Sequence, residues 1–80
     1  MSADVALTIR QSQVLGFLSM GLTAAEIGGR LAISPRTARA HIEVLKQKLG
    51  AARARELPMA YRRATGLDPV ALVLEVDARR

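Results

Sequence analysis

Three helix-start signals within the first 35 residues divide this chain into short helices joined by tight turns. Two are capping boxes, in which a threonine and the glutamine or glutamate three residues later satisfy free backbone N–H groups of a helix start: Thr8 with Gln11, and Thr23 with Glu26. The third is Ser34 with Pro35, an N-cap residue followed by the residue best suited to the first helical position. These signals predict helices that begin near residues 9, 24 and 35.

Glycines mark where these helices end. Gly21 and Gly50 stand where a left-handed residue would end the first and third helices, and the second helix is expected to end near Leu31. Gly28 and Gly29 lie inside the second helix, although each glycine costs about 1 kcal/mol of helix propensity relative to alanine. We interpret Gly28 as a point of close approach by another helix.

The predicted helix over 35–49 has two contrasting faces. Helical spacing predicts a buried seam made of Ala38, Ile42, Leu45 and Leu49. The opposite face carries polar or small residues, with Lys46 on its flank: Arg36, Arg39, Ala40, Glu43 and Gln47. Two short helices, a sharp turn and a third helix with such an outer face are typical of a helix-turn-helix. The sequence therefore predicts an all-α fold.

Positive charge is concentrated in the middle of the chain. The 80 residues carry a net charge of +5, and residues 34–63 hold eight Lys and Arg against two Glu, whereas residues 1–33 are neutral. A domain that presents one face to a polyanion has this distribution, although a solvated helix surface would share the composition. Only Phe17 and Tyr61 are aromatic, so the stacking surfaces that bind single strands and RNA are missing. Duplex DNA is the favoured polyanion.

The sequence argues against catalysis, metal binding and membrane insertion. No serine has a histidine and an acid at credible triad spacing, and no phosphate-binding loop of the G-x-x-x-x-G-K type occurs. There is no cysteine, and His41 is the single histidine, which we assign to packing or capping; no metal and no cofactor is expected. No apolar stretch approaches the roughly 20 residues of a membrane span, and no secretory signal is visible. The expected location is the cytoplasm, in association with the nucleoid.

Three stretches of the chain resemble a known family. LTIRQSQVL, GLTAAEIGGRLAISPRTARAH and KQKLGAARAREL are similar to the LuxR/GerE (NarL/FixJ) helix-turn-helix domains of bacterial transcription regulators, over about residues 7 to 64. The resemblance implies four helices, with the helix from Pro35 to Leu49 as the recognition helix in the major groove. It implies a transcription regulator that binds double-stranded DNA sequence-specifically, expected to act as a homodimer.

The resemblance also implies roles for individual residues. Base contacts are expected from Arg39, Ala40 and Glu43. Phosphate contacts are expected from Thr23, Ser34, Arg36, Thr37, Lys46 and Lys48. The side-chain chemistry fits base readout, because arginine can bind guanine and alanine can touch a thymine methyl group. Glutamate can accept a hydrogen bond from the amino group of cytosine.

Several positions depart from the family pattern. Gln11 stands where the family commonly has glutamate, and Ala32 replaces a usual glycine in the turn before the third helix. Glu43 sits where lysine or arginine is frequent, so its charge has the wrong sign for DNA unless it reads a cytosine. Pro58 requires the fourth helix either to begin near Arg55 or to be kinked.

We divide the chain into an N-terminal arm of residues 1–7, the helix-turn-helix domain of residues 8–64, and a C-terminal extension of residues 65–80. Residues 69–77 follow a helix cap at Asp68 and also alternate as an edge strand would, so both structures stay open. The extension either packs on the core or serves dimerisation. The residues expected at a dimer interface are Leu57, Tyr61, Leu72 and Leu74.

A second function is also consistent with the sequence. A chain that keeps the helix-turn-helix fold can act as an anti-activator, a non-catalytic module that binds another regulator through the fourth helix and the tail. Its protein partner would then be another regulator or RNA polymerase. Arg39 distinguishes the two functions, because only DNA readout requires its guanidinium.

Overall fold

The regular elements of the described chain are all helices, which confirms the predicted all-α class. The computed structural model describes residues 6–73. Along the chain the elements are α1 (Ile9–Ser19), α2 (Ala24–Leu31), α3 (Pro35–Leu49), the 3₁₀ turn η1 (Ala54–Glu56) and α4 (Leu57–Thr65). Residues 70–73 are helical as well.

All three predicted helix starts are present. In each capping box the threonine hydroxyl accepts a backbone N–H and the partner side chain accepts the threonine N–H, at 3.1 and 3.0 Å for Thr8 with Gln11 and at 3.2 and 2.8 Å for Thr23 with Glu26. Ser34 caps α3 by accepting the Thr37 N–H at 3.0 Å. Gly50 ends α3 in the left-handed region with φ of 66°, as expected.

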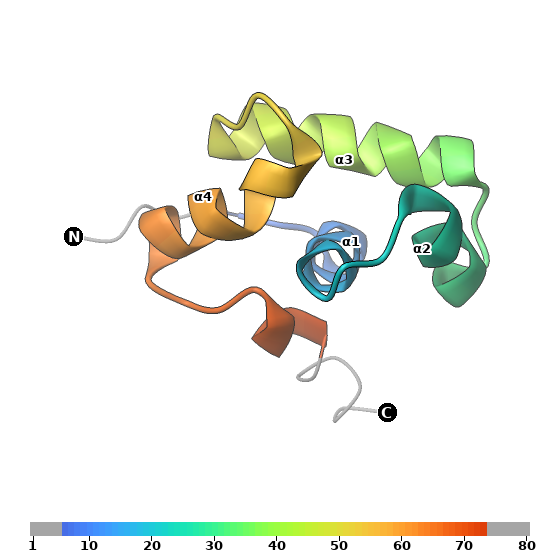
Figure 1. Ribbon diagram of the computed structural model, residues 1–80, viewed down its shortest axis with the longest axis horizontal. Coiled ribbons are helices and arrows are strands. Elements are labelled where there is room, and N and C mark those ends of the chain that lie inside the picture. Colours follow the sequence, from blue (N-terminus) through green and yellow to red (C-terminus); the bar gives the residue numbers. More distant parts are fainter. Residues whose placement is uncertain (1–5, 74–80) are drawn as a thin grey trace.

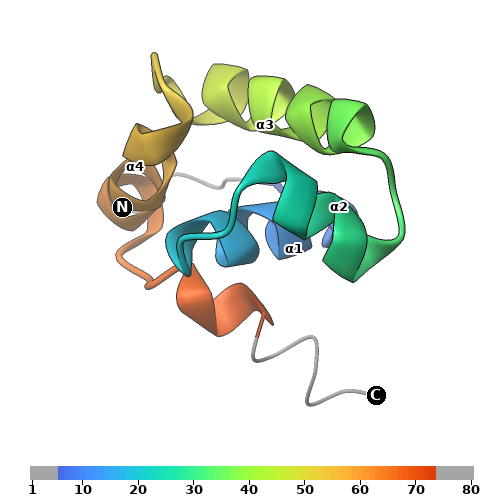
Figure 2. The same ribbon diagram turned by 45° about the vertical axis from the view of Figure 1, so that its right-hand side comes forward.

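The helices are arranged around α1. In Figures 1 and 2, α3 lies across one side of α1, and the helical segment 70–73 lies on the opposite side. α2 packs near the N-terminal end of α3, and α4 near its C-terminal end (Figure 1). Their inner faces form one core, whose buried residues are Val14, Leu15, Phe17, Ile27, Ala38, Ile42, Leu45, Leu57, Tyr61 and Val73. The seam predicted for α3 therefore faces inward, with Leu49 partly buried at its end.

Backbone contact closes the turn between α2 and α3 at Gly28. A Cβ at this position would lie 2.6 Å from the Ile33 carbonyl oxygen and 3.3 Å from the Pro35 nitrogen. The Ile33 N–H also donates to the Gly28 carbonyl at 3.0 Å. The close approach expected at Gly28 thus exists, but the turn and the start of α3 make it, rather than the body of another helix.

Ala32 ends α2 in an unfavourable backbone conformation. Its φ of 57° places it in the left-handed region, and it is the single non-glycine residue with positive φ within residues 6–73. A β-carbon in this region costs about 1 kcal/mol or more relative to glycine. This geometry explains why a glycine at this turn would be favoured.

Pro58 neither breaks nor kinks α4, because it lies in the first turn of that helix. The first turn needs no backbone N–H at this position. The 3₁₀ turn over Ala54–Glu56 absorbs the change of direction after α3, and the Glu56 carboxylate accepts the backbone N–H groups of Ala52 and Arg53 at 3.0 and 3.2 Å. The helix begins two residues after the position we expected from the sequence.

The described part of the C-terminal extension docks on the core. Pro69 is fully buried and Val73 is nearly so. Val73 fills a notch that Gly16 leaves in α1, because a Cβ at Gly16 would lie 2.1 Å from Val73 Cγ2. The Arg62–Asp68 ion pair, with Nη2 and Oδ2 3.0 Å apart, ties the start of the extension to α4. Residues 70–73 are helical rather than extended, and residues 74–80 lie outside the described part of the chain.

Candidate nucleic-acid interface

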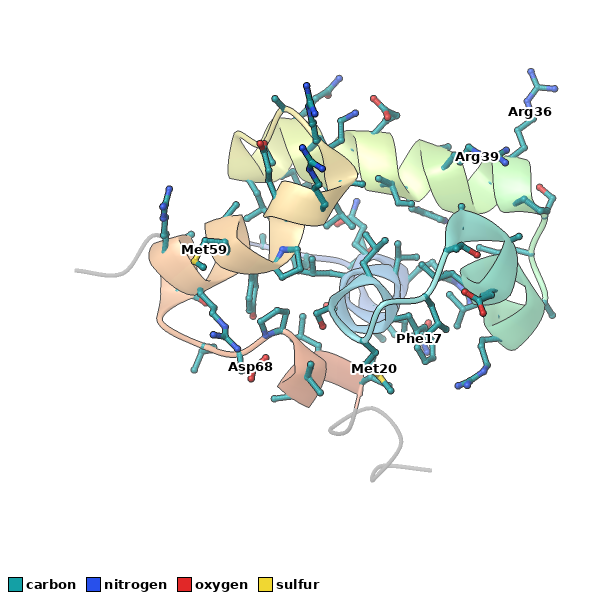
Figure 3. All side chains as sticks on the ribbon, viewed as in Figure 1. Phe17, Met20, Arg36, Arg39, Met59 and Asp68 are labelled. Atoms are coloured by element: carbon teal, nitrogen blue, oxygen red, sulfur yellow. The ribbon has the colours of Figure 1, made fainter. Side chains whose placement is uncertain are left out.

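The outer face of α3 is the surface that the sequence predicted for base contact. Arg36, Arg39, Ala40 and Glu43 are all exposed on it. Figure 3 shows Arg36 reaching away from the body of the molecule, with Arg39 one turn further along α3. Because Ala38 and Ile42 anchor the opposite side of the same helix in the core, this face is held rigidly toward the outside.

The N-terminus of α3 presents two hydroxyl groups. Ser34 Oγ donates to Thr37 Oγ1 at 3.0 Å and accepts the Thr37 backbone N–H. Both residues are exposed, next to Arg36. Hydroxyls and free N–H groups at a helix start are groups that can contact phosphate.

Glu43 is paired within α3. Lys46 Nζ lies 2.8 Å from Glu43 Oε2, while the Glu43 side chain is 65% exposed and the Lys46 side chain 23% exposed. The ammonium therefore reaches the carboxylate along the helix surface, and most of the Glu43 side chain stays exposed. The two predicted contacts, Glu43 with a base and Lys46 with a phosphate, are brought together in one unit.

Lys48 is held by the N-terminal part of the chain. Its Nζ donates to the Ala6 carbonyl and to Gln11 Oε1, both at 2.9 Å. Gln11 is the one buried polar residue within residues 6–73, and its Oε1 also accepts the Thr8 N–H. The structure thus places Lys48, which the resemblance assigns to phosphate, in a network that fastens α3 to the start of α1.

The substitution Lys48→Met tests how much these hydrogen bonds contribute to the stability of the domain. Replacing Lys48 with methionine keeps the aliphatic stem but leaves Gln11 with one hydrogen bond fewer, so we expect a loss of about 1 kcal/mol of unfolding free energy. Urea denaturation followed by circular dichroism measures the change. Gln47→Met is the matched control, because Gln47 is exposed one position earlier, and its stability should stay unchanged. Equal stability of the two variants would show that the Lys48 bonds do not contribute.

Thr23 is hydrogen bonded to the carboxylate of Glu26. Its backbone N–H donates to Glu26 Oε1 at 2.8 Å, and this bond holds the pKa of Glu26 below its ordinary value, with the Thr23 side chain and Arg30 acting in the same direction. A carboxylate therefore lies beside Thr23, one of the expected phosphate contacts. The neighbouring Arg30 is exposed.

Two of the residues expected at a dimer interface are buried in the structure. Leu57 is 0% exposed and Tyr61 is 6% exposed, so both side chains are buried in the core of a single copy rather than displayed on its surface. They belong to the inner face of α4, which packs against α1 and α3. Leu72 is partly buried against the same core, and Leu74 lies outside the described residues.

Among the exposed apolar residues of the described chain, sequence reasoning did not consider Val44 and Met59. Val44 lies on α3 one turn after Ala40, and Met59 is 53% exposed on α4. Met59 lies four residues before Arg63 on α4, and this spacing places both on one side of that helix, beside Arg55 of η1. They line a shallow groove between the end of α3 and α4 together with Gly50, Ala51, Glu56 and Ala60. The apolar residue between two arginines was the signal available in the sequence.

Residues 6–73 contain no candidate metal site and no candidate membrane span. No three His, Cys, Asp or Glu side chains in that range come together as ligands for a metal ion, and His41 is partly buried on α3. None of the helices described there has the length and apolar character needed to cross a membrane.

Most of this fold matches the model of a known protein family. The model of the family described as "Bacterial regulatory proteins, luxR family" (GerE) matches residues 5–60. The matched stretch runs from just before α1 into the first half of α4 and includes the whole of α3. No curated protein and no solved structure matches the chain.

Proposed function

The chain belongs to the luxR family of bacterial regulatory proteins, and on this premise we propose that it is a transcription regulator that binds double-stranded DNA sequence-specifically. α3 is the recognition helix and enters the major groove with its outer face. The observation that carries the proposal is that face itself, which is exposed, polar and anchored from behind by a buried seam.

The charge on α3 suits this role. Arg36 and Arg39 are exposed near its N-terminal end, and the single acid of the helix, Glu43, is paired with Lys46. The face therefore meets the phosphate backbone with a net positive charge. Attraction to phosphate supplies affinity that depends on salt, and the side chains on the groove side supply sequence preference.

Arg36, Arg39, Ala40 and Glu43 each have a proposed role. Arg39 reads a guanine and Ala40 lies close to a thymine methyl group, while Glu43 accepts from a cytosine. Arg36 contacts phosphate, together with the hydroxyls of Ser34 and Thr37 at the helix start. Two observations support these assignments. All of these residues are exposed, and Arg39, Ala40 and Glu43 share the outer face of α3.

We further propose that the regulator acts as a dimer on two half-sites, in the cytoplasm with the nucleoid. One domain of this size makes few base contacts, and two copies on a palindromic operator double that number. Leu57 and Tyr61 are buried within each copy, so the proposed dimer uses other residues. A symmetric motif in selected DNA, with a constant spacing between its halves, would support the dimer.

Arg39→Ala tests base readout. We expect operator binding to weaken by about 5- to 30-fold, or 1 to 2 kcal/mol, with relaxed preference at one base pair, because one bidentate contact to guanine is lost. The measurement is fluorescence anisotropy with operator obtained by selection from random duplexes. Arg63→Ala is the matched control, since it removes the same charge from an exposed position on α4 rather than from α3.

The two variants separate DNA readout from the interaction-module alternative. If the Arg39 variant and the Arg63 variant bind operator equally well, α3 does not read bases as proposed. If the unchanged protein selects no motif at any salt concentration, the proposed function fails, and a protein partner becomes the better explanation.

A further inference from the structure

Glu43 presents a physical problem for a helix that approaches DNA. It is the single acid among the fifteen residues of α3, and it lies on the exposed outer face. An unpaired carboxylate there would be repelled by the phosphates that flank the groove. The Lys46 ammonium, 2.8 Å from Oε2, offsets that repulsion.

The pairing with Lys46 uses only one of the two carboxylate oxygens of Glu43. Lys46 occupies Oε2, and within the described residues no group donates a hydrogen bond to Oε1. The Lys46 side chain is 23% exposed, so much of its stem is packed against the protein and the ammonium approaches from the flank of the helix. Glu43 therefore presents an unoccupied hydrogen-bond acceptor, Oε1, at an exposed position of α3.

The chemistry of the major groove restricts what this acceptor can bind. Donors there come from the N4 amino group of cytosine and the N6 amino group of adenine. Adenine places the N7 acceptor beside its amino group, which repels a second carboxylate oxygen, whereas cytosine presents no acceptor at that edge. A carboxylate without a donor of its own is consequently selective for cytosine.

We propose that Glu43 and Lys46 act as one unit that makes a cytosine an obligatory base of the operator half-site. This inference rests on the proposed function and names the base composition that the same site recognises. Glu43 makes the contact, and Lys46 is a positioning residue that fixes the carboxylate and neutralises it against the backbone.

Arg39 sets the place of that cytosine. It lies four residues before Glu43, which is about 6 Å along the helix axis. Successive base pairs are about 3.4 Å apart along DNA, so the two side chains reach bases no more than about two steps apart. The half-site therefore contains a guanine read by Arg39 and, within two steps of it, the cytosine read by Glu43.

The test is selection of bound duplexes from a random library with the full chain, followed by sequencing, for three forms of the protein. The unchanged protein should prefer cytosine over adenine at one position by about tenfold or more. Glu43→Gln should invert this preference, because glutamine can donate to N7 and accept from N6 of adenine. Preference at the guanine position should stay the same, which serves as an internal control.

The positioning role of Lys46 has its own readout. Lys46→Met should reduce the cytosine preference several-fold, and Lys46→Arg should restore it, since arginine can hold the same carboxylate. A role in phosphate binding alone would instead lower affinity equally for all duplexes and leave the base preference unchanged. Thermal unfolding checks that the variants are folded, as expected because Glu43 is exposed and Lys46→Met keeps most of the partly buried aliphatic stem.

The outcomes distinguish this inference from the function on which it rests. A motif that the unchanged protein selects, but that contains no cytosine responsive to Glu43→Gln, overturns the inference and leaves DNA readout standing. A motif in which Glu43→Gln exchanges cytosine for adenine supports it. The absence of any selected motif overturns the proposed function, and this inference with it.

Discussion

Gly28→Ala is expected to destabilise the domain by about 2 to 3 kcal/mol, whereas Gly29→Ala, one residue further along α2, should stabilise it by about 0.5 to 1 kcal/mol. The added Cβ at Gly28 would lie 2.6 Å from the Ile33 carbonyl oxygen, and backbone cannot move aside as the end of a flexible side chain can. At Gly29 nothing lies within 4 Å, so alanine brings only its better helix propensity.

Chemical denaturation in urea measures both changes, and each variant is the control for the other. The two substitutions add the same methyl group to the same helix, so intrinsic propensity cancels in the comparison. Equal stability of the two variants would mean that the turn relaxes without cost. Because Gly28 sets how closely the start of α3 approaches α2, its variant should also bind operator more weakly, in line with the altered angle of α3.

Gly16→Ala should destabilise the chain by about 1 to 2 kcal/mol by displacing the C-terminal extension. The notch at Gly16 holds Val73, whose Cγ2 would lie 2.1 Å from the new Cβ and whose backbone nitrogen would lie 3.1 Å away. Displacement exposes Val73 and the fully buried Pro69, and so removes apolar contact from the side of α1 opposite α3.

A double-mutant cycle identifies the contact. Val73→Ala removes the Cγ2 atom that collides, so Gly16→Ala should cost less in that background than in the unchanged chain. The cost of Gly16→Ala would be the same in both backgrounds if it arose within α1 alone. Operator binding should change little in either variant, because the notch and the outer face of α3 lie on opposite sides of α1 (Figures 1 and 2).

Local signals predicted the helices well, since each signal acts within a few residues of chain. Thr8 with Gln11 and Ser34 with Thr37 are caps whose partners lie three positions apart, so the sequence contains both halves of each hydrogen bond. Periodicity likewise identified Ala38 and Leu45 as buried. Periodicity could not separate helix from strand in the tail, because a short apolar run fits both periods.

The side chains near the C-terminal half of α3 were harder to predict. Lys48 was expected at a phosphate, and it donates to Gln11, 37 residues earlier. Leu57 and Tyr61 were expected at a dimer interface, because the family resemblance implies packing and self-association for the fourth helix. Only the packing of α4 against α1 and α3 reveals that these two residues complete the monomer's own core.

The sequence by itself determined where α1, α2 and α3 start and end, which face of α3 is buried, and which charged residues lie on its outer face. Those features depend on contacts of three or four residues along the chain, and helical periodicity makes them readable. The tertiary structure decided the contacts of Lys48, the notch between Gly16 and Val73, and the burial of Leu57. These depend on how separate helices meet in space, which no local spacing encodes, because distant residues become neighbours only when the whole core packs.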